Sequence, residues 1–180
     1  MKNYFVPDFM FAGFWDITPE FIRSLGVRAI VLDIDNTLVT YGMAEPTEQV
    51  IEWVKGMKDA GLLLSIASNN HEPRVAKFNE KLGLFTMCES KKPSRKAVKN
   101  ACAHFGVKPS ECVVIGDQIF TDVLCASRSG AHSILVTPLP YDENLFFRFK
   151  RVCEKPFIRA YKRREARKNK IGRASCRERV

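Results

Sequence analysis

Residues 29–38 read AIVLDIDNTL, and this stretch decides the fold. Four apolar residues run without interruption into two carboxylates, Asp33 and Asp35, and then into a polar turn. An unbroken apolar run is typical of a strand buried on both faces, as in a parallel sheet covered by helices on each side. Unpaired buried carboxylates are costly, so we expect a cation, most simply a metal ion, to meet them. The competing interpretation is a strand-terminal turn that uses Asp and Asn as turn formers.

Apolar runs alternate with segments of helical periodicity along the rest of the chain. After an aromatic lead-in, residues 1–28 are expected to contain one short helix from Pro19 to about Gly26. Further strands are expected at 62–67, 84–88, 112–115 and 133–137, with helices at about 46–61, 71–83, 92–106 and 122–130. This alternation predicts one α/β domain with a parallel, doubly wound sheet. A chain of 180 residues is long enough to bury the core of such a domain.

The net charge of +9 is unevenly distributed. Residues 1–143 carry 15 basic and 17 acidic side chains, whereas residues 144–170 carry 11 basic and 2 acidic ones. We therefore expect a nearly neutral body, residues 1–143, and a basic, aromatic helical segment, residues 144–170. Residues 171–180 resemble the in-frame translation of a sequencing-library adapter, so we expect them to be an artefact without a part in the fold.

The basic segment, residues 144–170, interleaves aromatic and cationic side chains. Its first apolar residues are Leu145, Phe146, Phe147 and Phe149. A helix of this composition can lie on an anionic membrane, gaining ~1 kcal/mol for each basic residue near the surface. The alternatives are a solvated helix that packs its aromatic side chains on the body and a non-specific contact with nucleic acid, whereas a specific nucleic-acid partner is not expected.

The composition indicates a cytoplasmic protein, peripheral on a membrane if the basic segment docks there. No apolar stretch approaches the ~20 residues of a membrane span. The aromatic run at 9–15 is flanked by Asp8 and Asp16 and lacks the basic leader of a secretory signal. The six cysteines form no C-x-x-C pair, which favours reduced core residues over disulfides or a zinc site.

Further polar residues follow other predicted strands. Ser68 precedes a helix, where its hydroxyl and backbone N–H groups can hold an anion. Lys92 is predicted at a helix start, where an ammonium is disfavoured by the helix dipole unless an anion is bound. Asp117 follows a glycine that permits a close backbone approach, and Asp122 lies near the next helix start. Ser68 and Asp122 could each be a helix cap. Together, the polar residues at the strand ends fit phosphoryl transfer with Mg²⁺, a carboxylate nucleophile and a second acid for proton transfer.

Four ordered motifs resemble those of the haloacid dehalogenase (HAD) superfamily. They are Asp33-Ile34-Asp35-Asn36-Thr37, Ser68-Asn69-Asn70, Lys92-Pro93, and Gly116-Asp117 with Asp122. The resemblance covers about residues 29–137 and implies a HAD-like Rossmannoid three-layer fold. It also implies a Mg²⁺-dependent phosphatase that works through an aspartyl-phosphate, because Asp35 is present and the dehalogenase branch lacks that acid.

The resemblance assigns a role to each motif residue. Asp33 is the expected nucleophile and Asp35 the general acid/base. The expected phosphate-binding residues are Thr37, Ser68, Asn69 and Lys92, with Lys92 preferred to Lys91 because a proline follows it. Mg²⁺ is expected on Asp33, the main-chain carbonyl of Asp35 and Asp117, with Asp122 supporting the metal.

Motif spacing narrows the resemblance further. About 30 residues separate Thr37 from Ser68, which is the size of one βαβ unit. The interval from Ser68 to Lys92 is shorter, so neither can hold a cap domain and the site should be open to a bulky substrate. Sequence details such as Asp16–Glu20 resemble YqeG-type class IIIA phosphatases, a group similar to mitochondrial phosphatidylglycerophosphate phosphatases.

That likeness implies a phospholipid head group as the substrate. The alternatives are a phosphorylated soluble small molecule, such as a sugar or nucleotide phosphate, and a non-catalytic module that binds RNA or an assembly partner. The intact acid pair argues against the non-catalytic module, because a pure binding protein has no need of Asp35.

Overall fold

The computed structural model describes residues 3–140 and 145–177, except for the side chains at 146, 147 and 169–177. The contacts divide the chain into a body, residues 2–142, and a segment that begins at residue 143. Their use as functional units, with boundaries at 143 and 170, remains a prediction.

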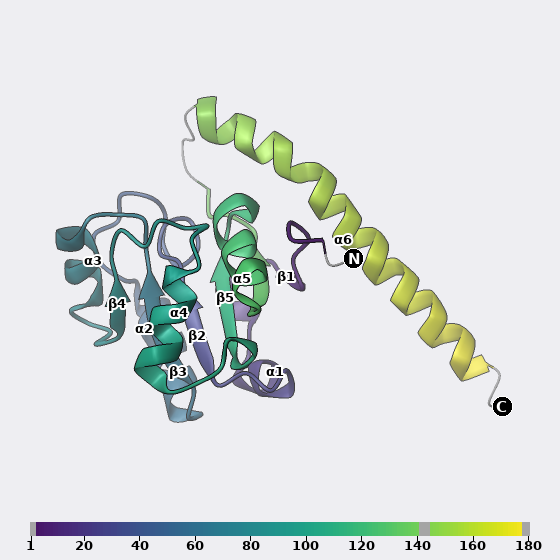
Figure 1. Ribbon diagram of the computed structural model, residues 1–180, viewed down its shortest axis with the longest axis horizontal. Coiled ribbons are helices and arrows are strands. Elements are labelled where there is room, and N and C mark those ends of the chain that lie inside the picture. The colour runs from purple at the N-terminus through teal and green to yellow at the C-terminus, as the bar shows by residue number, and fades with distance from the viewer. Residues whose placement is uncertain (1–2, 141–144, 178–180) are drawn as a thin grey trace. The chain divides into compact units, whose positions relative to one another are not determined.

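The body is built on a parallel six-stranded sheet in the order β1-β6-β5-β2-β3-β4 (Figure 1). Its strands are β1 (Phe9–Phe11), β2 (Ala29–Leu32), β3 (Leu63–Ala67), β4 (Phe85–Met87), β5 (Cys112–Gly116) and β6 (His132–Val136). The predicted α/β class with a parallel, doubly wound sheet is confirmed. Because β2 pairs with β3 on one side and with β5 on the other, its carboxyl end lies where the strand order reverses, the usual ligand site of such sheets.

Helices cover both faces of the sheet and make three layers. They are α1 (Pro19–Ser24), α2 (Glu48–Asp59), α3 (Glu72–Asn79), α4 (Lys96–Phe105) and α5 (Leu124–Ser129). Alternate residues of β2 face opposite layers: Ile30 and Leu32 pack with residues of α1, α2 and α3, whereas Ala29 and Val31 pack with α4 and α5. All four are buried, which explains why this strand reads as a continuous apolar run.

The start of one helix and the presence of one strand differ from the sequence-based expectation. The helix expected at Lys92 begins only at Lys96, because residues 91–94 form a turn in which the Ser94 N–H donates to the Lys91 carbonyl at 2.8 Å. The helix-dipole argument for Lys92 is therefore wrong. Strand β1 was not predicted, since its three residues lie inside the aromatic lead-in and pair with the distant strand β6.

The segment from residue 143 contains one helix, α6 (Leu145–Arg177), with Pro156 inside it. Three apolar side chains of α6 that repeat at helical spacing are largely exposed: Leu145 at 81%, Phe149 at 68% and Val152 at 56%. The predicted contributions of Phe146 and Phe147 lie outside the described side chains. Residues 171–177, expected to have no part in the fold, continue the backbone of α6, and residues 178–180 lie outside the described part of the chain. Within the part of the chain that the structure describes, every helix is too short or too polar to cross a membrane.

Candidate active site

The turn after β2 positions the first two motif residues. Asp33 directly follows the strand, and its N–H donates to the Ile115 carbonyl of β5 at 3.0 Å, so the residue continues the sheet. Asn36 adopts a positive φ of 58°, which asparagine tolerates better than most residues, and the chain reverses there. The reversal brings the Thr37 hydroxyl to 3.5 Å from Asp117 Oδ1, at the end of β5.

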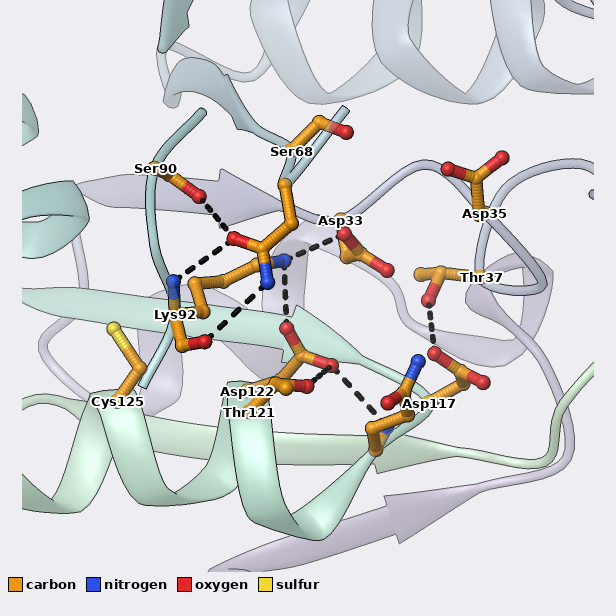
Figure 2. A network of polar contacts seen from close by, with 12 residues as sticks. Asp33, Asp35, Thr37, Ser68, Ser90, Lys92, Asp117, Thr121, Asp122 and Cys125 are labelled. Carbon is orange, nitrogen blue, oxygen red and sulfur yellow. Dashed lines mark hydrogen bonds and ion pairs between the residues drawn. The ribbon is translucent and has the colours of Figure 1, made fainter. Parts of the chain in front are cut away.

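Lys92 lies between two acids from different strand ends. Its ammonium is 2.5 Å from Asp33 Oδ1 and 2.7 Å from Asp122 Oδ1, as Figure 2 shows. The three side chains are 3%, 10% and 1% exposed, so the interaction is shielded from water. Lys91 is exposed and adopts a positive φ of 52°, so of the two neighbouring lysines it is Lys92 that reaches the acids.

The Lys92 backbone is held by Asn69. Asn69 Oδ1 accepts from the Lys92 N–H at 2.9 Å and from the Ser90 hydroxyl at 3.0 Å, and its Nδ2 donates to the Lys92 carbonyl at 3.3 Å. The Asn69 side chain is therefore occupied in orienting Lys92. A phosphate contact of Asn69 would come from its main-chain N–H, and that assignment remains a prediction.

Asp122 is held by its neighbours in sequence, in the π-helical turn η3 (Ile119–Val123). Its Oδ2 accepts from the Gln118 N–H at 3.2 Å and from the Thr121 hydroxyl at 3.1 Å. A Cβ at position 116 would overlap the Asp122 carboxyl group, so Gly116 is required for this close approach. The absence of a side chain at Gly116 thus lets Asp122 reach Lys92.

Burial controls the charge state of this cluster. Desolvation raises the pKa of Asp33 to about 8, opposed by the Lys92 charge and reinforced by the charges of Asp122 and Asp117. Desolvation lowers the pKa of Lys92, but the charges of Asp122 and Asp33 outweigh it and leave that pKa above its usual range. Lys92 is therefore always charged at neutral pH, while Asp33 needs further positive charge to become a fully ionised nucleophile.

Three carboxylates are arranged so that they could hold a metal ion. One oxygen each of Asp33, Asp117 and Asp122 lies within 4.8 Å of the others, and all three residues are buried. Lys92 is the cation that the structure places on two of them, so ionisation of all three acids leaves negative charge to be balanced. Hard oxygen ligands of this kind suit a divalent cation such as Mg²⁺.

Asp35 lies apart from the Lys92 network in Figure 2. Its Oδ1 accepts from the Arg74 guanidinium and its Oδ2 from the side-chain amide of Asn70. Ser68, which is buried at the end of β3, accepts the Asn70 N–H on its hydroxyl at 3.0 Å. The second acid of the β2 motif is thus paired with residues that follow β3.

The structure brings the predicted site residues to one edge of the sheet but also adds residues that the sequence did not single out. Arg74, Asn70 and Ser90 are the main additions. Asn70 belongs to the Ser68-Asn69-Asn70 motif, so its presence in the site could have been predicted from the sequence. Arg74 is identified as part of the site only when the approach of α3 to the β2 turn is known.

The amino-acid sequence matches one family model and two known phosphatases. Residues 90–138 match the Hydrolase_like family model, described as HAD-hydrolase-like. The chain is 40% identical over 164 residues to "Probable phosphatase YqeG" of Bacillus subtilis (strain 168), covering 91% of this chain and 95% of that protein. It is 29% identical over 138 residues to phosphatidylglycerophosphate phosphatase 1, chloroplastic/mitochondrial, of Arabidopsis thaliana, covering 71% of this chain but 39% of that protein.

Solved structures support the same fold. A hypothetical protein from Xanthomonas campestris is 21% identical with a TM-score of 0.54, covering 69% of this chain and 76% of its own. The cobalt-bound deoxy-D-mannose-octulosonate 8-phosphate phosphatase of Haemophilus influenzae is 14% identical with a TM-score of 0.52, covering 76% and 90%. At these identities the likeness concerns the fold alone. The 40% identity to the Bacillus subtilis protein over nearly the whole of both chains, together with the match to the HAD-hydrolase-like family model, shows that the chain belongs to the YqeG-type phosphatases of the haloacid dehalogenase superfamily.

Proposed function

We propose that this phosphatase is a Mg²⁺-dependent phosphomonoesterase that works through an aspartyl-phosphate on Asp33 and acts on the head group of phosphatidylglycerophosphate. The observation that carries the chemistry is the buried contact of Lys92 with Asp33 inside a cluster of three carboxylates. A carboxylate held next to a fixed ammonium can approach a phosphate dianion that it would otherwise repel.

The proposed reaction has two steps, each with a balanced proton transfer. In the first, an Asp33 oxygen attacks phosphorus, the bond from phosphorus to the alcohol oxygen breaks, and Asp35 gives its proton to that oxygen. In the second, water attacks the phosphorus of the aspartyl-phosphate and gives a proton to Asp35. Inorganic phosphate leaves, and the Asp33 carboxylate is restored.

The remaining site residues hold the phosphoryl group during these steps. Thr37, Ser68 and the Asn69 main-chain N–H would bind its oxygens, and Lys92 would neutralise its charge. Asp33, Asp117 and the main-chain carbonyl of Asp35 would hold Mg²⁺, with Asp122 supporting that site through its charge and its contact with Lys92. Bound there, Mg²⁺ supplies positive charge that stabilises the transferring phosphoryl group and favours the ionised form of Asp33.

Three observations support a lipid substrate. The interval between β2 and β3 contains only α2, and the interval between β3 and β4 contains only α3, so neither inserts a cap domain over the site. One relative carries phosphatidylglycerophosphate phosphatase in its name. The exposed Leu145, Phe149 and Val152 of α6 lie on a helix rich in Lys and Arg, a combination that suits peripheral contact with an anionic membrane.

A substrate panel tests this proposal. Phosphatidylglycerophosphate in mixed micelles, glycerol 3-phosphate, a sugar phosphate and a nucleoside monophosphate are assayed for phosphate release with Mg²⁺ and with a chelator. We expect the lipid to give the highest kcat/KM and the chelator to abolish turnover. A preference for a soluble sugar or nucleotide phosphate would overturn the lipid assignment.

Replacement of the nucleophile tests the covalent mechanism. Asp33→Asn should lower turnover by more than about 1,000-fold, because an amide of nearly the same shape is not a nucleophile. Circular dichroism checks that the variant folds, and acid-quenched wild type incubated with ³²P-labelled substrate should retain label on Asp33. Near-normal turnover by the variant would exclude Asp33 as the nucleophile.

A further inference from the structure

Arg74, near the start of α3, pairs with the residue to which we assign proton transfer. Its Nη2 donates to Asp35 Oδ1, and the Arg74 and Asp35 side chains are 24% and 16% exposed. The same guanidinium lies 5.7 Å from the ring centroid of Tyr41, in the loop that follows the β2 turn. Arg74 is therefore held against two residues of the segment that connects β2 to α2, at the carboxyl end of β2.

The Arg74 side chain is only partly satisfied by Asp35. Its Nε is buried and has no hydrogen-bond partner among the residues that the structure describes, although a guanidinium normally uses several of its five N–H groups when it is shielded from water. Asp35 engages Arg74 through one oxygen, while the other oxygen accepts from Asn70. A phosphate group can accept two parallel N–H bonds from the fork of an arginine, which a carboxylate held in this way does not do.

The pairing also restrains Asp35. A general acid must carry its proton toward the leaving-group oxygen, but both oxygens of Asp35 accept hydrogen bonds from fixed side chains here. A ligand that draws Arg74 away would free one oxygen of Asp35. An anionic group of the substrate is the natural competitor, because it offers the guanidinium the same charge and more acceptor atoms.

From this geometry we propose that Arg74 forms a subsite for a second anionic group of the substrate, a phosphodiester close to the scissile monoester. When the phosphodiester binds, Arg74 gives up its hydrogen bond to Asp35 and donates to the phosphodiester instead. Asp35 then becomes available to protonate the leaving-group oxygen. This inference rests on the proposed function and deepens it. It selects substrates in which two phosphate groups are joined by a short diol over those that carry a lone phosphomonoester.

Two soluble substrates that differ in the second anion test the subsite. One is the deacylated head group, glycerophosphoglycerol phosphate, which has a diester and a terminal monoester, and the other is glycerol 3-phosphate. Wild type should prefer the first in kcat/KM by about 10- to 100-fold, the scale of a hydrogen-bonded charge pair. Arg74→Gln should reduce this preference to about one, chiefly through KM for the diester, and Arg74→Lys should retain part of it.

Matched controls separate binding from positioning. Arg28→Gln removes an exposed arginine that pairs with Glu111 in another part of the body, and it should keep the full preference. Propanediol bisphosphate tests whether a second monoester can replace the diester. A higher kcat/KM for it than for glycerophosphoglycerol phosphate would overturn the assignment of the subsite to a diester. Glycerophosphoglycerol, which has no scissile group, should inhibit wild type at least tenfold more strongly than Arg74→Gln.

The outcomes distinguish this inference from the proposed function. If Arg74→Gln slows both substrates by the same factor, Arg74 only positions Asp35 and the subsite is overturned. If wild type hydrolyses both substrates without preference, the subsite is overturned while the phosphatase chemistry stands. If wild type hydrolyses neither with Mg²⁺ present, the proposed function fails and the subsite fails with it.

Discussion

The active-site edge of the body and helix α6 use positive charge in opposite ways. Lys92 is 3% exposed and lies within 2.7 Å of each of two buried carboxylates. Residues 144–170, most of which belong to α6, carry 11 basic and 2 acidic side chains. A buried and paired charge resists screening by salt, whereas exposed and unbalanced charges are screened within ~8–10 Å at roughly 0.1–0.15 M salt. From this difference we propose that Lys92 serves the chemistry and that α6 serves association.

Of the changes that test this comparison, the largest effect is expected on association. Reversal of Arg159, Lys162, Arg163 and Arg164 to Glu should weaken binding to anionic vesicles by about 1,000-fold, because each cation near the surface contributes ~1 kcal/mol. Hydrolysis of a small soluble phosphoester should be spared. Co-sedimentation with vesicles of anionic and of neutral lipid measures this, with neutral vesicles as the control.

Salt and competition complete the test of α6. Wild-type binding to anionic vesicles should fall steeply as salt rises. Unchanged vesicle binding by the reversed variant would show that α6 is not the anchor. Competition by RNA at equal phosphate concentration would favour non-specific charge attraction over a membrane role.

A smaller effect, on turnover, is expected for the buried cation. Lys92→Met should lower kcat by about 100-fold, because the developing charge on the phosphoryl group loses its fixed counter-charge. The variant should also lose about 3 kcal/mol of folding free energy, since a buried ion pair that loses one partner leaves an unpaired charge. Lys91→Met is the matched control and should change both quantities little, because Lys91 is exposed. Equal losses in the two variants would show that Lys92 is not the functional lysine.

The effect of pH on the affinity for Mg²⁺ should be smaller still, about tenfold per pH unit. The pKa of Asp33 is raised to about 8 by burial, whereas in the unfolded chain it is about 4. Between these values the metal-free folded state binds more protons than the unfolded state, so its stability should fall as pH rises from about 4 to 8. Mg²⁺ competes with that proton, so its apparent affinity should rise by up to about tenfold per pH unit until about pH 8.

Thermal unfolding with and without Mg²⁺ at pH 6 and pH 8 measures both effects. The gain in Tm from Mg²⁺ should be greater at pH 8, and Asp33→Asn should remove most of this difference. A Mg²⁺ effect that is equal at the two pH values would show that Asp33 does not exchange its proton for the metal.

The smallest effect is expected at the chain end. Deletion of residues 171–180 should leave Tm and kcat unchanged, because these residues are neither periodic nor apolar enough to pack. A clear fall in Tm on deletion would show that the adapter-like sequence contributes to the fold.

The fold could be predicted from sequence because its signals are local. The run at 29–32 reads as a doubly buried strand and is one, and the alternation of strands and helices fixes the parallel sheet. Strand β1 escaped prediction because Phe9–Phe11 is too short to show a period and is stabilised by pairing with the distant β6. The late start of α4 depends on a turn at 91–94 that no helix signal reveals.

The part of the site that follows from the sheet topology was predictable. Parallel strands place their carboxyl ends at one edge, so Asp33, Ser68 and Asp117 were expected to meet. Contacts that depend on the orientation of a helix relative to the sheet were not predictable. The pairing of Arg74 with Asp35 is the clearest case. The sequence of α3 shows an arginine there but not that it reaches the turn after β2.

Because glycine has no Cβ, the residue type at position 116 indicates whether Asp122 can reach Lys92. Any larger residue would displace Asp122, which would deprive Lys92 of one partner and disturb the charge balance at Asp33. A related chain could therefore retain all its acids and its lysine and still have an inactive site. When HAD-like sequences are classified as active or inactive, the residue type at the position of Gly116 should be considered together with the acids at the positions of Asp33, Asp117 and Asp122.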